Sequence, residues 1–246
     1  MHETELWFTA FLNKYLAAPP NALYNLVGYH TEDPSKPWSN YIAMEIIVVL
    51  ALMALALLVR ARLSVDRPGK LQLVIENYWE FISTQAGDII GHGAKRHLSY
   101  FAMLFLFIVC SNLLGIVPTF ESPTMYYYVP AGMAVATFFY YNGQGIQAQG
   151  VLGHLKHFCG PMWWLAWFMF PLEIISHLIR PFSLTIRLFA NMLAGEQVTL
   201  GFLSMAPWGV PVIFMGLHAF VSFVQAFIFT VLAMVYVGEA VAHQDH

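Results

Sequence analysis

The segment RPFSLTIRLFANMLAGE, residues 180–196, places two permanent cations inside the longest apolar stretch of the chain. An arginine near the centre of a bilayer costs about 2.5 to 3.5 kcal/mol on insertion scales, so such a residue is expected to face water or a partner group. On a helix, residues seven apart differ by only about 20° in direction. Glu173, Arg180 and Arg187 are therefore predicted to form one charged stripe, with Glu196 on the opposite side.

Polar residues accompany this stripe and recur along one face of the last apolar segment. They are Ser176, Ser183 and Asn191 beside the stripe, and His218, Ser222, Gln225 and Tyr236 in the last segment. Their spacings of three, four, seven and eleven residues place each set on one side of a helix. Ser, Gln and His also serve as structural hydrogen-bonding residues between membrane helices, and this alternative stays open for Ser222 and Tyr236.

The composition requires a membrane environment. Of 246 residues, 59% are hydrophobic and 10% are charged, whereas soluble domains carry about 25% charged residues. The net charge of -3, without a basic face, argues against a nucleic-acid partner. Cys110 and Cys159 lack the paired spacing of a metal site and are predicted to be free thiols. The start of the chain resembles neither a signal peptide nor a transit peptide, which favours a bacterial plasma membrane.

Three segments have the length and composition expected of membrane crossings, since a spanning helix needs about 20 mainly apolar residues. They are Tyr41–Val59, His97–Val117 and a shorter, aromatic-rich third segment, Tyr126–Tyr141, which the turn-like sequence NGQG follows. Between the first two, residues 69–91 alternate apolar and acidic positions at helical spacing. This pattern predicts an amphipathic helix on the membrane surface.

The last two apolar segments are too long for upright crossings. Residues 162–203 contain no loop signal except Pro171 and Pro181, and a continuous helix of this length would measure about 63 Å against a hydrocarbon core of about 30 Å. Either the segment breaks into two spans or it is steeply tilted, and its scattered polar residues favour the tilted helix. Residues 211–241 would measure about 46 Å. The predicted fold is an all-α polytopic membrane protein with five membrane-embedded helices, the last two long and steeply tilted.

Residues 1–40 are predicted to form an extramembrane or interfacial segment, and residues 41–246 a single membrane domain with the surface helix. Its orientation follows from the basic residues, which concentrate between the first two crossings and include Lys156 after the third. Cytoplasmic loops of membrane proteins are enriched in Lys and Arg. We therefore expect the N-terminus outside and the C-terminus in the cytoplasm.

Three stretches resemble a known family: RPFSLTIRLFANMLAGE, LHAFVSFVQAFIFTVLAMVYV and SNLLGIVP. Together they look like the signature of subunit a of F-type ATP synthases. The resemblance implies a stator subunit that gives protons two half-channels to a ring of c subunits, and that couples proton flow to rotation and ATP synthesis. It also implies contact with the b-subunit peripheral stalk and the rest of the complex. No cofactor is expected, and no bond chemistry is expected on this chain.

The resemblance also assigns roles to individual residues. Arg187 matches the essential arginine that faces the ring. Residues that match the half-channel open to the outside are Glu196, His218, Asn191 and Gln225, whereas Glu173, Ser176 and Ser183 match the inner half-channel. Arg180 matches a position that is basic in relatives, and its alternative role is snorkelling or pairing with Glu173. The transported ion is predicted to be H⁺, because no cluster of additional oxygen ligands for Na⁺ is evident.

One position departs from the family pattern, and two other functions remain open. Relatives often carry an acid in the stretch NLLGIVP where this chain has Gly115, and Glu121 or water could replace it. A haem-bearing oxidoreductase would use His177 and His218 as axial ligands, and a visible absorption band would reveal it. A free-standing ion channel or carrier is the stronger alternative, and co-purification with a c ring would distinguish it.

Overall fold

The computed structural model describes residues 6–21, 36–64, 68–91, 93–117, 120–158, 166–205 and 210–241. Within these residues every element of regular secondary structure is helical, which confirms the predicted all-α class. The elements are α1 (Trp7–Tyr15), α3 (Asn40–Ala61), α4 (Lys70–Ile90), α5 (Ala94–Leu114), the 3₁₀ helix η1 (Pro123–Met125), α6 (Tyr128–Phe158), α7 (Ala166–Met205) and α8 (Val210–Val241).

The predicted amphipathic segment forms α4, and glycines define both of its ends. Gly69 precedes the helix, and Gly91 follows it with φ 71°. Gly93, just before α5, has φ 96°. Side chains disfavour such positive φ angles, so the two glycines allow the sharp reversal between α4 and α5. The helix is thereby confirmed, while its position on a membrane surface stays a prediction.

Three of the described helices are long and apolar enough to cross a membrane. They comprise Asn40–Ala61, Ala94–Leu114 and Val212–Val241. The chain is thus consistent with a multi-pass helical membrane protein. The other two predicted crossings correspond to α6 and α7, which are long helices that carry more polar residues. Five crossings therefore remain a prediction.

The helix that corresponds to the third predicted crossing is longer than the sequence predicts. Instead of turning at NGQG, α6 continues to Phe158, and its only non-helical backbone is at Gly150 (φ 73°, ψ 165°). Asn142 donates its side-chain amide to the carbonyl of Phe138, 2.8 Å away and one helical turn earlier. This bond keeps within the helix a side chain that often initiates a turn. Packing of α6 against α7 and α8 outweighs the local turn preference.

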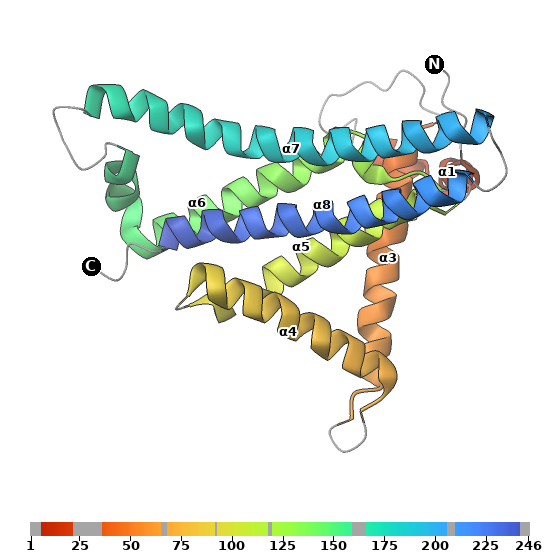
Figure 1. Ribbon diagram of the computed structural model, residues 1–246, viewed down its shortest axis with the longest axis horizontal. Coiled ribbons are helices and arrows are strands. Elements are labelled where there is room, and N and C mark those ends of the chain that lie inside the picture. Colours follow the sequence, from red (N-terminus) through yellow and green to blue (C-terminus); the bar gives the residue numbers. More distant parts are fainter. Residues whose placement is uncertain are drawn as a thin grey trace.

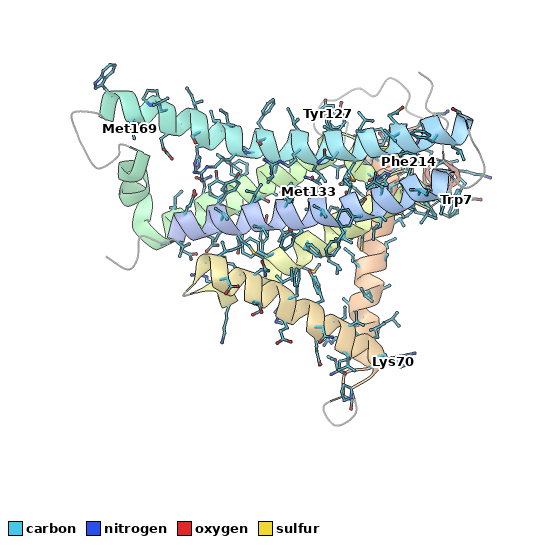
Figure 2. All side chains as sticks on the ribbon, viewed as in Figure 1. Trp7, Lys70, Tyr127, Met133, Met169 and Phe214 are labelled. Carbon is cyan, nitrogen blue, oxygen red and sulfur yellow. The ribbon has the colours of Figure 1, made fainter. Side chains whose placement is uncertain are left out.

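The two long C-terminal segments form an antiparallel pair. In α7, one continuous helix of 40 residues includes Pro171 and Pro181, so the alternative of two broken spans is wrong for the described residues. α8 has 32 residues and lies along α7 (Figure 1). Met169, early in α7, and Phe214, early in α8, lie at opposite ends of the pair (Figure 2). The start of α8 therefore lies beside the end of α7, whereas the first turns of α7 extend beyond the end of α8 (Figure 1).

The main hydrophobic core joins α4, α5, α6, α7 and α8. Phe101, Ile108, Leu188, Met192 and Phe229 are fully or almost fully buried in it. A smaller cluster around Leu12, Ala43 and Met44 joins α1 to α3. Helix α3 stands steeply to one side, next to the end of α4 to which it is connected (Figure 1). The core thus fixes α7 and α8 relative to α5 and α6, and these four helices carry the polar residues identified in the sequence.

Candidate functional site

Arg187 lies on the exposed face of α7. The face that packs on the core carries Leu184, Leu188 and Met192, which are four residues apart and buried, as expected for one side of a helix. Arg187 is exposed, and the neighbouring Ile186 is 46% exposed. Within the described part of the chain, no acidic side chain pairs with Arg187. Tyr236 on α8 is close enough to Arg187 to interact with it electrostatically.

Asn191 and Gln225 connect α7 to α8 close to Arg187. The amide Nδ2 of Asn191 donates to Oε1 of Gln225 at 2.7 Å. Gln225 is buried, and its Nε2 has no hydrogen-bond partner among the described residues. The sequence placed these residues on two helices, and the structure brings them into direct contact one helical turn from Arg187.

Glu196 and His218 lie further along the same helix pair. A methyl group on Gly195 would be 3.3 Å from Nδ1 of His218, so the imidazole packs directly against α7 beside Glu196. Oε2 of Glu196 and Nε2 of His218 are both buried without a hydrogen-bond partner among the described residues. Glu121, just before η1, is close enough to Glu196 for the two carboxylates to interact electrostatically.

We call Glu121, Asn191, Glu196, His218 and Gln225 the Glu196 cluster. It unites four residues predicted from the sequence with Glu121, one of the two groups considered in place of the acid missing from NLLGIVP. The structure also explains why residue 115 is a glycine, because there is no room for a side chain at this position. A Cβ atom on Gly115 would be 2.8 Å from Cβ of Ser122, closer than real Cβ contacts.

Hydrogen bonds from α5 hold the Glu121 segment in place. Asn112 accepts a hydrogen bond from Thr124 at 2.6 Å and donates to the backbone carbonyl of Ser222 on α8 at 3.1 Å. Ser122 donates to the carbonyl of Ser111 at 3.0 Å. Ser222, whose structural alternative was left open, is fully buried and donates to the sulfur of Met192 at 3.8 Å. This network joins α5, η1, α7 and α8 around the Glu196 cluster.

On the other side of Arg187, Arg180 pairs with Glu239. Arg180 Nη1 and Glu239 Oε2 are 2.6 Å apart, and the Arg180 guanidinium lies 4.9 Å from the ring centroid of Tyr236. The predicted alternative, pairing of Arg180 with Glu173, is therefore wrong. Because α8 runs antiparallel to α7, its C-terminal end reaches Arg180, and the sequence analysis had not considered Glu239.

His177 extends this group toward α6. Its Nε2 lies 3.1 Å from the hydroxyl oxygen of Tyr141 and 2.8 Å from Oδ1 of Asn142. The Tyr141 and Tyr236 ring centroids are 5.8 Å apart. We call Tyr141, Asn142, His177, Arg180, Tyr236 and Glu239 the Glu239 cluster. The available signal was the position of Glu239 three residues after Tyr236, on a helix otherwise poor in charge.

The three remaining predicted residues stay on α7 without joining either cluster. Glu173 and Ser183 are half-buried and Ser176 is exposed. No hydrogen bond or ion pair joins any of them to another described residue. Their positions at helical spacing from Arg187 thus agree with the predicted stripe, while Arg180 alone gains a partner.

The geometry excludes a haem bound between His177 and His218. His218 packs against Gly195, which is 18 residues beyond His177 on the same helix, or about 27 Å along its axis. Two axial ligands must bind one iron, so these residues cannot serve together. Among the described residues, no group of three or more His, Cys, Asp or Glu side chains could hold a metal ion. Cys110 is a free thiol, and Cys159 lies outside the described residues.

Comparison with known proteins identifies the family. Residues 42–238 match the family model described as ATP synthase A chain. ATP synthase subunit a of Koribacter versatilis is 49% identical over 239 residues, which cover 97% of this chain and 98% of that protein. ATP synthase subunit a of Solibacter usitatus is 52% identical over 232 residues, which cover 94% and 99% of the two chains. The chain therefore belongs to the ATP synthase subunit a family.

Proposed function

We propose that this chain is the proton-translocating stator subunit of an F-type ATP synthase, with two half-channels separated by Arg187. It works within the complete ATP synthase, against a ring of c subunits and beside the b-subunit peripheral stalk. The observation that carries the proposal is the position of Arg187. It is exposed on α7, has no ion-pair partner among the described residues, and separates the Glu196 cluster from the Glu239 cluster along the helix.

The chemistry of guanidinium suits a fixed electrostatic barrier. It keeps its proton at any accessible pH, so it cannot relay protons between the two half-channels. A carboxylate that the ring brings beside Arg187 is stabilised in its charged form and releases its proton. When rotation moves this carboxylate into lipid, the neutral, protonated form is favoured. Proton release and uptake on opposite sides of Arg187 would thus be coupled to rotation.

The exposed face around Arg187 suits close contact with the ring. Ala190, Ala194 and Gly201 lie on it, and all three are exposed. Small residues allow helix backbones to approach closely in membranes. A c-subunit helix could therefore come near enough for its carboxylate to reach the guanidinium.

The Glu196 cluster supplies the half-channel open to the outside. Three of its polar side-chain atoms are buried without hydrogen-bond partners among the described residues, and buried polar groups of this kind are usually satisfied by ordered water. Glu196 and His218 can bind and release protons. Asn191 and Gln225 cannot titrate, but their bonded side chains orient water and Arg187.

The inner half-channel lies on the opposite side of Arg187, along Glu173, Ser176 and Ser183. Arg180 borders this path, where its bond to Glu239 holds α7 and α8 together. This assignment places Glu173 and Glu196 at the two outer ends of the path, with Arg187 between them.

In the membrane, we propose five embedded helices, α3, α5, α6, α7 and α8, with α4 on the surface. At 40 and 32 residues, α7 and α8 measure about 60 and 48 Å, so both must be steeply tilted in a core of about 30 Å. Residues 1–40 form the extramembrane or interfacial segment and residues 41–246 a single membrane domain. The N-terminus lies outside a bacterial plasma membrane and the C-terminus in the cytoplasm.

The test is ATP synthesis by sodium-free vesicles that carry the whole complex and receive an imposed pH gradient. We expect Arg187→Ala to abolish synthesis while the content of a, b and c subunits stays normal. Arg187→Lys should also impair it, because a lysine buried against the c ring loses its proton more easily than arginine. Lys95→Gln removes a distant exposed cation and serves as the control.

Normal synthesis by assembled Arg187→Ala complexes would disprove the barrier role. A chain that conducts protons in vesicles but never co-purifies with a c ring would instead support a free-standing channel. Synthesis that requires added sodium would show that the transported ion is Na⁺.

A further inference from the structure

Two neighbouring cavities form an apolar groove between α3, α4 and α5. The first has a volume of about 520 Å³ and the second about 460 Å³. Both are lined by Leu52, Ala56 and Met103, so they are continuous. Val49 and Phe107 line one end of the groove. Arg60 and Trp79 line the other end, near the connection between α3 and α4.

The lining of the groove suits an acyl chain. An extended acyl chain is much thinner than a helix. Its apolar surface matches a lining that is almost entirely aliphatic and aromatic along the shared stretch.

The described residues at one end of the groove carry positive charge. Arg60 lines the cavity and is exposed, and no acidic residue among the described ones pairs with it. None of the described residues that line either cavity is acidic. Arg62 is also exposed, and Lys70 lies at the corner where α4 begins (Figure 2). This end therefore attracts an anion at the level where α3 leaves the membrane.

Trp79 adds a second feature of that level. It lines the same cavity as Arg60 and is 44% exposed. Tryptophan is enriched where the hydrocarbon core meets the headgroups, and basic pockets between membrane helices on the cytoplasmic side bind anionic lipid headgroups. A cation and an interfacial aromatic residue thus stand where a long apolar groove opens.

We propose that this groove binds one anionic phospholipid. Its phosphate contacts Arg60, and an acyl chain lies along Leu52, Ala56 and Met103. The lipid would fill the space between α3 and the α4–α5 pair, and so support the position of α3. The site is separate from both polar clusters around Arg187.

The proposal can be tested by photolabelling of the complete ATP synthase in phosphatidylcholine nanodiscs. One sample contains a small fraction of diazirine-bearing phosphatidylglycerol, and the other an equal fraction of diazirine-bearing phosphatidylcholine. Labelled peptides of α3 and α5 are then quantified by mass spectrometry. We expect the phosphatidylglycerol probe to label the groove about fivefold more, the factor that one basic residue contributes at a membrane surface.

Four variants sharpen the test, with subunit content as the check on assembly. Arg60→Gln should reduce phosphatidylglycerol labelling to the phosphatidylcholine level, whereas Arg60→Lys should retain most of it. Ala56→Trp should fill the groove and abolish labelling by both probes. Lys95→Gln, which removes a cation lining a different cavity, should leave the labelling unchanged.

Two results would overturn the proposal. Equal labelling by the two probes, unaffected by Arg60→Gln, would show that the headgroup is not recognised. Absence of lipid labelling, together with oxidative cross-linking of Ala56→Cys to a cysteine in another subunit, would show that a protein segment occupies the groove.

Discussion

On one side of Arg187, the polar side chains of the Glu239 cluster form hydrogen bonds and an ion pair with one another. On the other side, several polar atoms of the Glu196 cluster have no hydrogen-bond partner among the described residues. In the Glu239 cluster, Arg180 pairs with Glu239 at 2.6 Å and His177 lies within hydrogen-bond distance of Tyr141 and Asn142. In the Glu196 cluster, one polar atom each of Glu196, His218 and Gln225 is buried without a partner among the described residues. The same two helices contribute to both clusters.

From this difference we infer a supporting role for the Glu239 cluster and a conducting role for the Glu196 cluster. Side chains that are already hydrogen-bonded resist rearrangement, because breaking a hydrogen bond leaves its donor or acceptor without a partner. Buried groups without protein partners are usually satisfied by water, and a chain of water and titratable groups can move protons. We therefore expect substitutions in the Glu196 cluster to reduce proton pumping most. The Glu239 cluster should act mainly by fixing α7 against α8 and α6.

Within the two clusters, the largest effect is expected from Glu196→Gln. The amide keeps the shape of the side chain but cannot carry a proton, so ATP-driven proton pumping should fall about 100-fold or more, the usual contribution of a positioned proton-transfer group. Fluorescence quenching of a pH-sensitive dye in inverted vesicles measures this. Gln197→Ala, at the exposed neighbouring position, is the control. Pumping near the wild-type rate in Glu196→Gln would remove Glu196 from the proton path.

A smaller effect is expected from Gly195→Ala. The added methyl group would be 3.3 Å from Nδ1 of His218, so the imidazole must shift, and misplacement of a functional group by a fraction of an ångström should reduce pumping by about tenfold. Gly216→Ala is a matched control, because a methyl group there meets nothing within 4 Å. If both variants pump equally well, the position of His218 against α7 has no functional importance.

The smallest effect is expected in the Glu239 cluster. Glu239 is 52% exposed, so its ion pair with Arg180 should contribute at most about 1 kcal/mol. Arg180→Gln and Glu239→Gln should each slow pumping by no more than about fivefold, and the double variant should be no worse than the poorer single one. A double-mutant cycle of pumping rates measures this coupling. A loss as severe as that from Glu196→Gln would place Glu239 in the conducting path and erase the contrast between the clusters.

The sequence predicted helices better than it predicted where they end. The apolar runs led to α3, α5, α7 and α8 within a few residues, because a membrane helix needs a long stretch without charge. NGQG looked like a turn, yet α6 passes through it. A turn preference is a local property of weak energy, and contacts with α7 and α8 overcame it.

The site residues show the same limit. Spacing predicted one stripe of Glu173, Arg180 and Arg187, and all three lie on the continuous helix α7. The pairing with Glu173 that it offered as one alternative for Arg180 is wrong, since the partner is Glu239, 59 residues away in the chain. The position of Glu121 beside Glu196 also depends on how α5 and η1 pack on α7, and no periodicity encodes that contact.

The sequence by itself determined the all-helical class, the need for a membrane, the family and the exposed arginine of α7, because composition and helical periodicity are properties of single segments. Only the tertiary structure decided which polar groups are bonded and which stay unsatisfied. It paired Arg180 with Glu239, placed His218 against Gly195 and left a groove beside Arg60. These contacts depend on the packing of separate helices, which the pattern along any one of them does not specify.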